Sequence, residues 1–227
     1  PCGAVGGPDR AHESFSPVQK AINYSMTAFF TTGGIRGGKK KLDKFYPRSF
    51  NMGIRADLYR RLGGFSAMRF GEDIDFSIRI FKSGASCRLF PEAWVWHKRR
   101  TDMKKFFKQV HNSGIARINL QKRHPGSMKL VHLLPAVFTA GIACLALLFL
   151  AGLVLLGANL YGIHSMSGTG ADDHMLHVGV LIGCIAMACS LIPPVLYSIL
   201  IFSDSLIQNR SCKVALLSIK ASFIQLL

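Results

Sequence analysis

The sequence predicts an α/β domain followed by an all-α membrane domain with two or three transmembrane helices. In the first 130 residues, short apolar runs and amphipathic stretches alternate with glycine-rich breaks, which is typical of mixed strands and helices. Two later stretches, 133–157 and 175–202, contain no Asp, Glu, Lys or Arg and are long enough to span a bilayer. A third apolar stretch from residue 213 fits either a third span that the sequence cuts short or an interfacial helix.

These patterns divide the chain into three parts. Residues 1–100 form the predicted α/β part, 101–130 an amphipathic helix with a basic linker, and 131–227 the membrane domain. The second predicted span carries Pro193-Pro194, so we expect a kink there.

The α/β part opens with residues 1–15, which are rich in Gly and Pro and are predicted to be loop. Ser16-Pro17 predicts a helix start, because it combines a capping hydroxyl with proline at the first helical position. Residues 31–44 hold four glycines and three consecutive lysines. They fit either a solvated surface loop or a loop that an anionic ligand orders.

Two helices and two strands are expected next. A short helix at 55–62 closes at Gly63-Gly64, and a second runs from 71 to 84 with Gly84 as its stop. The predicted buried face of the second helix is Ile74, Ile78 and Phe81. Strands are expected at 87–90 and 93–96, interrupted by Pro91.

A further helix is predicted from Thr101, as its cap, to about Leu120. It has an apolar side that includes Phe106 and Phe107, with lysines around the rest. Two interpretations stay open: a helix lying in the membrane interface, or an ordinary amphipathic helix packed on its own domain.

The net charge of the chain limits the classes of partner that we expect. The net charge is +16 although only 18% of residues are charged, and the excess lies mostly before residue 130. Such a field favours anionic membrane lipids or phosphorylated small molecules. Nucleic acid is not expected, because the sequence has neither zinc-finger spacing nor an RNP-type motif. The link between the spans has no Lys or Arg and both outer flanks are basic, which predicts that residues 1–130 are cytoplasmic.

The six cysteines form no CxxC pair, so we expect reduced thiols rather than disulfides or a zinc site. The chain begins without Met and without a signal-peptide pattern. We therefore expect it to be an internal portion of a longer protein.

The clearest chemical feature is Glu72-Asp73 at the start of a predicted helix. Adjacent helical side chains project about 100° apart, so the two carboxylates cannot share one task. First-turn amides and the helix dipole favour an ionised carboxylate there. That suits a base that takes a proton from a hydroxyl nucleophile, although acidic residues are also common in first turns without any catalytic role.

Four segments together resemble the family-two glycosyltransferases, which are inverting enzymes of the GT-A fold that often carry C-terminal transmembrane helices. The matching segments are GGPDRAH (6–12), FNMGIRADLYRRLGGF (50–65), FGEDIDFSIR (70–79) and WVWHKRRT (94–101). The resemblance implies that Asp73 is the catalytic base and that Glu72 is its neighbour at the acceptor site. Residues 1–100 would then be the acceptor-side half of a GT-A-like domain.

The resemblance also implies ligands. A nucleotide-diphosphate sugar would be the donor, with a divalent cation, Mg²⁺ or Mn²⁺, on its diphosphate and His97 as a metal or diphosphate ligand. Arg99 and Arg100 would neutralise a diphosphate or a lipid phosphate; membrane-surface charge is the other interpretation. The predicted substrate-binding set also includes Asp9, Arg36, Asn51 and Arg79.

Two departures from the family pattern limit these expectations. No DxD motif occurs in residues 1–69, so the main metal ligands and the nucleotide-binding half are expected upstream. The QxxRW motif of processive synthases is not matched, since Asn112 and Ser113 follow Gln109 where Arg and Trp would stand.

The expected function is therefore that of a multi-pass glycosyltransferase of the inner (plasma) membrane with a cytoplasmic catalytic part. It would transfer a hexose-like sugar to a lipid-linked or cell-envelope glycan, as in polysaccharide biosynthesis, and this portion alone would be inactive. The alternative is a non-catalytic membrane-surface protein that binds anionic lipid or glycan.

Overall fold

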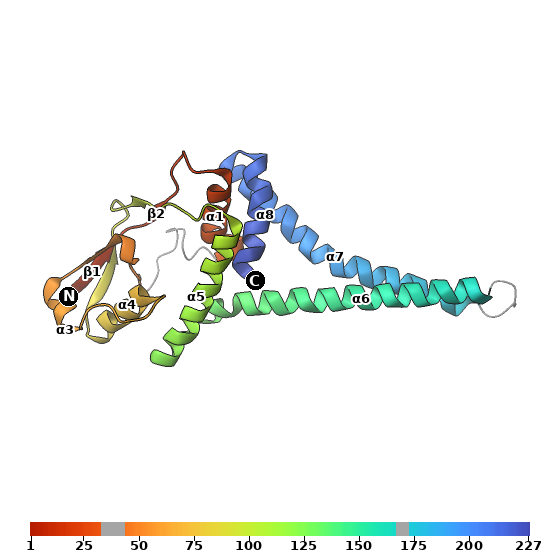
Figure 1. Cartoon of the computed structure of the whole chain (residues 1–227), viewed down its shortest axis with the longest axis horizontal. Coiled ribbons are helices and arrows are strands. Elements are labelled where there is room, and N and C mark those ends of the chain that lie inside the picture. Colours follow the sequence, from red (N-terminus) through yellow and green to blue (C-terminus); the bar gives the residue numbers. More distant parts are fainter. Residues whose placement is uncertain (33–43, 167–172) are drawn as a thin grey trace.

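The computed structural model describes residues 1–32, 44–166 and 173–227. A small α/β part leads into a cluster of helices, from which a long helical hairpin projects (Figure 1). Within the described residues, the elements in chain order are β1 (Cys2–Gly6), β2 (Asp9–Arg10), α1 (Pro17–Thr27), α2 (Phe29–Thr32), η1 (Ser49–Asn51), β3 (Met52–Ile54), α3 (Ala56–Arg61), α4 (Glu72–Lys82), β4 (Ser86–Leu89), β5 (Val95–Trp96), α5 (Met103–Arg123), η2 (Leu130–Leu133), α6 (Leu134–Met166), α7 (Asp173–Asn209) and α8 (Cys212–Leu226).

The strands form two small sheets. In the first, the order is β3-β1-β4, with β1 antiparallel to β3 and parallel to β4. In the second, β2 and β5 pair in parallel, with Asp9 opposite Val95. The prediction that residues 1–15 are loop is wrong for β1 and β2. Pairing on both edges of β1 overrides the low strand propensity of its glycines.

Position 7 requires glycine for a steric reason. A Cβ on Gly7 would lie 1.7 Å from the carbonyl oxygen of Ala93. The segments that leave the parallel strands β1 and β4 therefore meet at a distance that only glycine allows. The GGPD sequence thus serves close backbone contact at the carboxyl ends of these strands.

The α/β core lies between the first sheet and α4. Phe76 and Ile80 of α4 are fully buried and pack with Leu58 and Ala4. The predicted face is wrong in part, because Ile74 is buried but Ile78 and Phe81 are only half-buried. The buried stripe instead follows the spacing Asp73, Phe76, Ser77 and Ile80, so polar side chains occupy positions that hydrophobicity alone does not identify.

Helix boundaries follow the predicted signals in most places. Ser16 caps α1 in a capping box with Gln19. Gly71 and Gly84 flank α4 with φ of 82° and 80°, which is the left-handed region that favours glycine. Thr101 is not the cap of α5: Asp102 is, and its Oδ1 accepts the Lys105 amide at 2.7 Å. A carboxylate one residue later offers a better acceptor at this position.

The helix α5 joins the α/β part to the helical cluster. Phe106 is fully buried against α1 and α8, in contact with a cluster that includes Ile22 and Val214. Farther along α5, Ala116 lies beneath Gly71, where a Cβ would approach it to 3.3 Å. Part of the apolar side of α5 is therefore packed on the protein itself, while Phe107, Ile115 and Ile118 are exposed.

Helices α6 and α7 form the projecting hairpin (Figure 1). Gly152 and Gly183 face each other so closely that a Cβ on Gly152 would lie 2.8 Å from the carbonyl oxygen of Gly183. Such small-residue contacts are typical of packed membrane helices. Pro193 and Pro194 both lie inside α7.

The hairpin is exposed as well as apolar. Segments Leu130–Ser165 and His174–Asn209 are long and apolar enough to cross a membrane, and only 6% and 11% of their most apolar parts are buried. Helices in the core of a soluble domain would be covered by protein. Exposed apolar surface of this extent is compatible with helices that cross a membrane.

The last helix, α8, packs against α1, α5 and α7 and runs across the axis of the hairpin (Figure 1). Ala215, Ser218 and Ala221 are fully buried on its inner side. Polar contacts also tie the cluster to the hairpin: Tyr24 donates to Asp204 at 2.5 Å, and Ser205 lies 2.8 Å from Ser218. The stretch predicted from residue 213 is thus a helix held on the protein cluster.

Candidate functional site

Asp73 lies in the first turn of α4 and keeps only 11% of its side chain exposed. Its Oδ1 accepts the amide of Ile74 at 2.8 Å, and its Oδ2 lies 3.5 Å from Nη1 of Arg48. That second distance is longer than a typical charge-assisted hydrogen bond. Oδ2 therefore has a nearby positive charge without being locked to it.

A second arginine faces the same group from α5. Burial lowers the pKa of Arg117, and the charge of Arg48 lowers it further, while Asp73 acts in the opposite direction. Tyr46 lies nearby, and burial raises its pKa against the effect of Arg117. The loop before η1 thus places Arg48 close to the Asp73 carboxylate, and Arg117 of α5 acts on the same carboxylate electrostatically.

Glu72 differs from its neighbour. It is half-buried and forms no ion pair with any residue in the part of the chain that the structure describes. The two adjacent carboxylates therefore have different surroundings: Arg48 lies near Asp73, and no described arginine or lysine pairs with Glu72.

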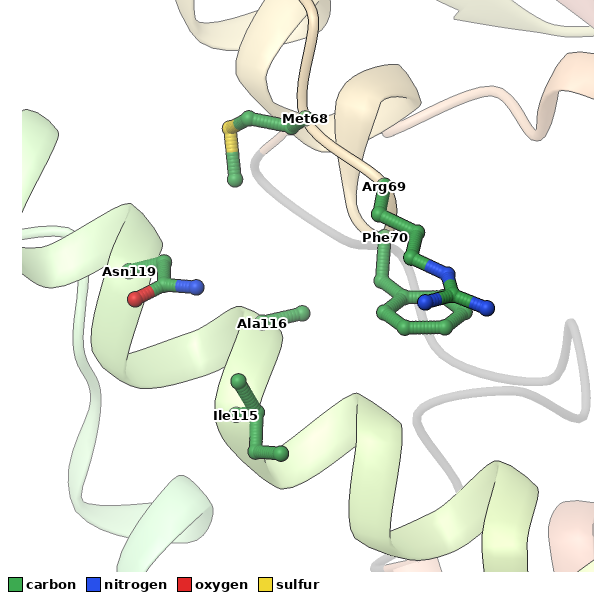
Figure 2. Close-up of a pocket in the computed structure, with 6 residues that line it drawn as sticks. All are labelled: Met68, Arg69, Phe70, Ile115, Ala116 and Asn119. Carbon is green, nitrogen blue, oxygen red and sulfur yellow. The ribbon is translucent and has the colours of Figure 1, made fainter.

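A hollow of about 220 Å³ opens beside the start of α4. Figure 2 shows Met68, Arg69 and Phe70 on the loop before α4 facing the α5 side chains Ile115, Ala116 and Asn119. Gly71 connects this loop to Asp73, so the hollow and the carboxylate share one helix start. Its lining is mostly apolar, with the guanidinium of Arg69 and the amide of Asn119 as polar groups.

Two residues predicted to bind substrate, Asp9 and Arg99, instead form an ion pair with each other. Nη2 of Arg99 lies 2.6 Å from Oδ2 of Asp9, and both Nε and Nη2 of Arg99 donate to Oδ1 of Asn23. Gln19 donates to the backbone oxygen of Arg99 at 2.9 Å. Arg99 is only 7% exposed, so it connects β2 to α1 inside the fold.

The remaining predicted residues are dispersed. Arg79 donates to the backbone oxygens of Leu62 and Gly64 and so holds the turn after α3. Asn51 donates to the backbone oxygen of Ala93 at 2.7 Å. Arg100 is exposed and donates to Gln109, and Arg36 lies outside the described residues.

His97 does not lie in a metal-binding arrangement. Its ring stacks on Phe50 at a centroid distance of 4.0 Å, and burial followed by the charge of Arg99 lowers its pKa. Across residues 1–32, 44–166 and 173–227, no group of three or more His, Cys, Asp or Glu side chains is placed to hold a metal ion. The main ligands of the divalent cation are expected upstream, and among the described residues His97 belongs to no such group.

Sequence reasoning missed the most elaborate polar cluster. Asp75 is fully buried and lies 3.0 Å from Nε of Arg79, 2.8 Å from Nε2 of His124 and 3.5 Å from Nε of Arg123. Burial by itself raises the pKa of Asp75, but the His124 hydrogen bond and the two arginine charges outweigh it and hold that pKa below its usual value.

The i,i+4 spacing of Asp75 and Arg79 was the one visible sign of this cluster, because such pairs meet on a helix. The contribution of His124, which lies 49 residues away, has no sequence signal.

Comparison of the chain with protein-family models, with curated proteins and with solved structures finds no match.

Proposed function

We propose that this chain belongs to a membrane-anchored inverting glycosyltransferase, with Asp73 as its catalytic base. The observation that carries the proposal is the placement of the Asp73 carboxylate. It lies at a helix start, with Arg48 at 3.5 Å and with Arg117 coupled to it electrostatically, and the loop that precedes it lines a hollow. Buried carboxylates that only stabilise a fold have closer and more numerous partners, as Asp75 has.

The proposed reaction needs one proton acceptor. The acceptor hydroxyl gives its proton to Oδ2 of Asp73 while its oxygen attacks the anomeric carbon of the donor sugar. The bond from that carbon to the diphosphate oxygen breaks, and the nucleoside diphosphate leaves. In-line attack inverts the anomeric configuration. Arg48 and Arg117 would orient the carboxylate and offset the negative charge that gathers during transfer.

The hollow of Figure 2 is the proposed seat of the acceptor. Its lining suits the apolar face of a sugar ring or the first part of a lipid carrier, and Arg69 and Asn119 can bind hydroxyl or phosphate oxygens. One wall of the hollow is formed by α5, the helix that also packs on the helix cluster through Phe106, and this continuity supports an acceptor that reaches the site from the membrane side.

The activity assay is direct. Full-length protein in micelles is supplied with a panel of nucleotide-diphosphate sugars, and release of nucleoside diphosphate is measured with and without membrane lipid extract as the acceptor source. Asp73→Asn should lower turnover by roughly 10²–10⁴-fold, the usual contribution of general acid–base catalysis. Its matched control is Asp57→Asn, which alters an exposed carboxylate paired with Arg55 on α3. Near wild-type turnover for Asp73→Asn would remove this residue from the mechanism.

The proposed orientation places the α/β part in the cytoplasm, which is supported by the basic flanks of the two apolar helices. A cysteine introduced at Ser167, between these helices and outside the described residues, should react with a membrane-impermeant thiol reagent in intact cells once the six native cysteines are replaced. Reaction only after permeabilisation would reverse the orientation.

One observation favours the non-catalytic alternative, a membrane-surface protein that binds anionic lipid or glycan. Arg79 and Arg99, both predicted to bind substrate, are used inside the fold, whereas Lys104, Lys105 and Lys108 are exposed on α5. Under this alternative the full-length protein would bind anionic vesicles yet turn over none of the sugar nucleotides, with or without Asp73.

A further inference from the structure

A second cavity, of about 250 Å³, lies on the other side of α4 from its core face. It is formed by the last turn of α4, the loop before η1 and the turn after α5. Among its lining residues are Lys44, Tyr46, Phe81, Lys82, His124 and Ser127. A cavity of this size can hold one small polar group or one part of a larger ligand.

One of its cations is held in place by a buried relay. Nζ of Lys82 lies 3.1 Å from Nδ1 of His124, and Nε2 of His124 lies 2.8 Å from the buried Oδ1 of Asp75. An ammonium group can only donate, so Nδ1 accepts and the proton of the neutral imidazole is on Nε2. His124 is 7% exposed and Asp75 fully buried. Two buried side chains therefore fix the ammonium of an exposed lysine at the cavity.

The second cation is Lys44, whose Nζ lies 5.4 Å from the centroid of the Phe81 ring. Within residues 1–32, 44–166 and 173–227, neither lysine forms an ion pair with a carboxylate. Asp75, which contacts His124, is already paired with Arg79 and Arg123. Among the described residues, therefore, no carboxylate neutralises the two ammonium groups at the cavity.

We infer that this cavity binds a phosphate group, held by the ammonium groups of Lys44 and Lys82. Phosphate fits because two convergent ammonium groups match its several charged oxygens, and the hydroxyls of Tyr46 and Ser127 lie on the same lining. The site is separate from the carboxylate of Asp73, and the inference does not depend on glycosyl transfer.

Two sources can supply that phosphate: a lipid headgroup or a soluble phosphate. Ser127 is three residues before Leu130, where the first membrane-compatible segment begins. Three extended residues span at most about 11 Å. The cavity is therefore within reach of the headgroup layer, and the experiment has one arm for each source.

The Nδ1 resonance of His124 reports on the site, because that atom accepts from Lys82. Full-length protein labelled with ¹⁵N-histidine is placed in uncharged micelles, and the resonance is assigned by its loss in His124→Gln. In the first arm, inorganic phosphate is titrated at constant ionic strength against sodium chloride. In the second arm, the protein is moved from phosphatidylcholine nanodiscs to nanodiscs that also contain phosphatidylglycerol.

A saturable shift with phosphate but not with chloride, or a shift with phosphatidylglycerol, supports the site and identifies its source. Lys44→Gln should raise the half-saturating concentration by about tenfold, since a charge-assisted contact is lost. Lys108→Gln, which removes an equal charge from α5 outside the cavity, should change it less than about twofold. No shift in either arm, or an equal effect of the two substitutions, would overturn the inference.

Discussion

Asp73 and Asp75 are two residues apart on the same helix, yet the fold treats them differently. Asp75 is fully buried and in contact with Arg79, Arg123 and His124 from two helices. Asp73 is also buried, but its side chain keeps 11% exposure and has only one backbone donor and one arginine at 3.5 Å. In a helix, positions i and i+2 point in nearly opposite directions, so one carboxylate can enter a dense cluster of charged partners while the other has few contacts.

The difference separates a structural role from a chemical one. A buried carboxylate whose oxygens are all engaged cannot accept a proton without disrupting its surroundings. A carboxylate with one backbone donor and a single long arginine contact can, as at Asp73. Electrostatic surroundings alone do not distinguish the two residues, since both face arginines; the number of contacts and the remaining exposure do.

The largest expected effect on stability comes from Asp75→Asn. Removing one partner of a buried charge cluster leaves Arg79 and Arg123 without their counter-charge, and we expect a loss of ~3 kcal/mol in the free energy of unfolding. For a chain of this size that corresponds to a fall of about 6–12 °C in Tm, measured by thermal unfolding in micelles.

Asp57→Asn serves as the control, because Asp57 is an exposed carboxylate paired with Arg55. It should leave the Tm nearly unchanged. Equal Tm values for Asp75→Asn and wild type would show that the buried cluster does not stabilise the fold.

Lowering the pH should gradually remove the contribution of Asp75 to stability. The pKa of Asp75 is held below its usual value in the folded protein. A carboxyl group of this kind stabilises the fold at pH values above its unfolded pKa, about 3.9, and the contribution disappears as pH falls through the lower folded pKa. The Tm difference between wild type and Asp75→Asn should therefore be constant near neutrality and shrink below about pH 4. If the Tm difference between wild type and Asp75→Asn instead shrank as pH rose above neutrality, the predicted pH dependence of this contribution would be wrong.

A smaller effect is expected from Arg48→Gln, which tests the Asp73 carboxylate. The contact to Asp73 is long and Arg48 is 34% exposed, so stability should change by less than about 1 kcal/mol. Turnover of the full-length protein should fall by about tenfold, which is the rate effect of ~1.4 kcal/mol in the transition state. Arg55→Gln, which breaks an exposed ion pair elsewhere, should leave turnover unchanged. Loss of stability without loss of turnover in Arg48→Gln would make the Asp73 region structural as well.

Local signals in the sequence predicted much of the architecture. Ser16, Gly63, Gly64 and Gly84 mark helix ends that the structure contains, because capping and left-handed glycines act within a few residues. The two long apolar stretches likewise appear as exposed helices.

What could not be predicted depends on residues far apart in the chain. β1 is a strand because β3 and β4 pair with it, and Arg99 is buried because Asp9 and Asn23 meet it. The positions of Asp73 and Glu72 at a helix start were predictable, but the approach of Arg48 and Arg117 was not. The buried relay from Asp75 through His124 to Lys82 also spans 49 residues of sequence between its first two members.

The central claim is that Asp73 performs chemistry while Asp75 maintains the fold. The most direct test compares Asp73→Asn and Asp75→Asn in one preparation of full-length protein, measuring Tm and the rate of sugar-nucleotide turnover per folded molecule at a temperature below both transitions. Asp73→Asn should keep the wild-type Tm and lose roughly 10²–10⁴-fold in turnover. Asp75→Asn should lose Tm and retain most of its turnover. The account is contradicted if Asp73→Asn turns over at the wild-type rate, or if its loss of activity is matched by an equal loss of Tm.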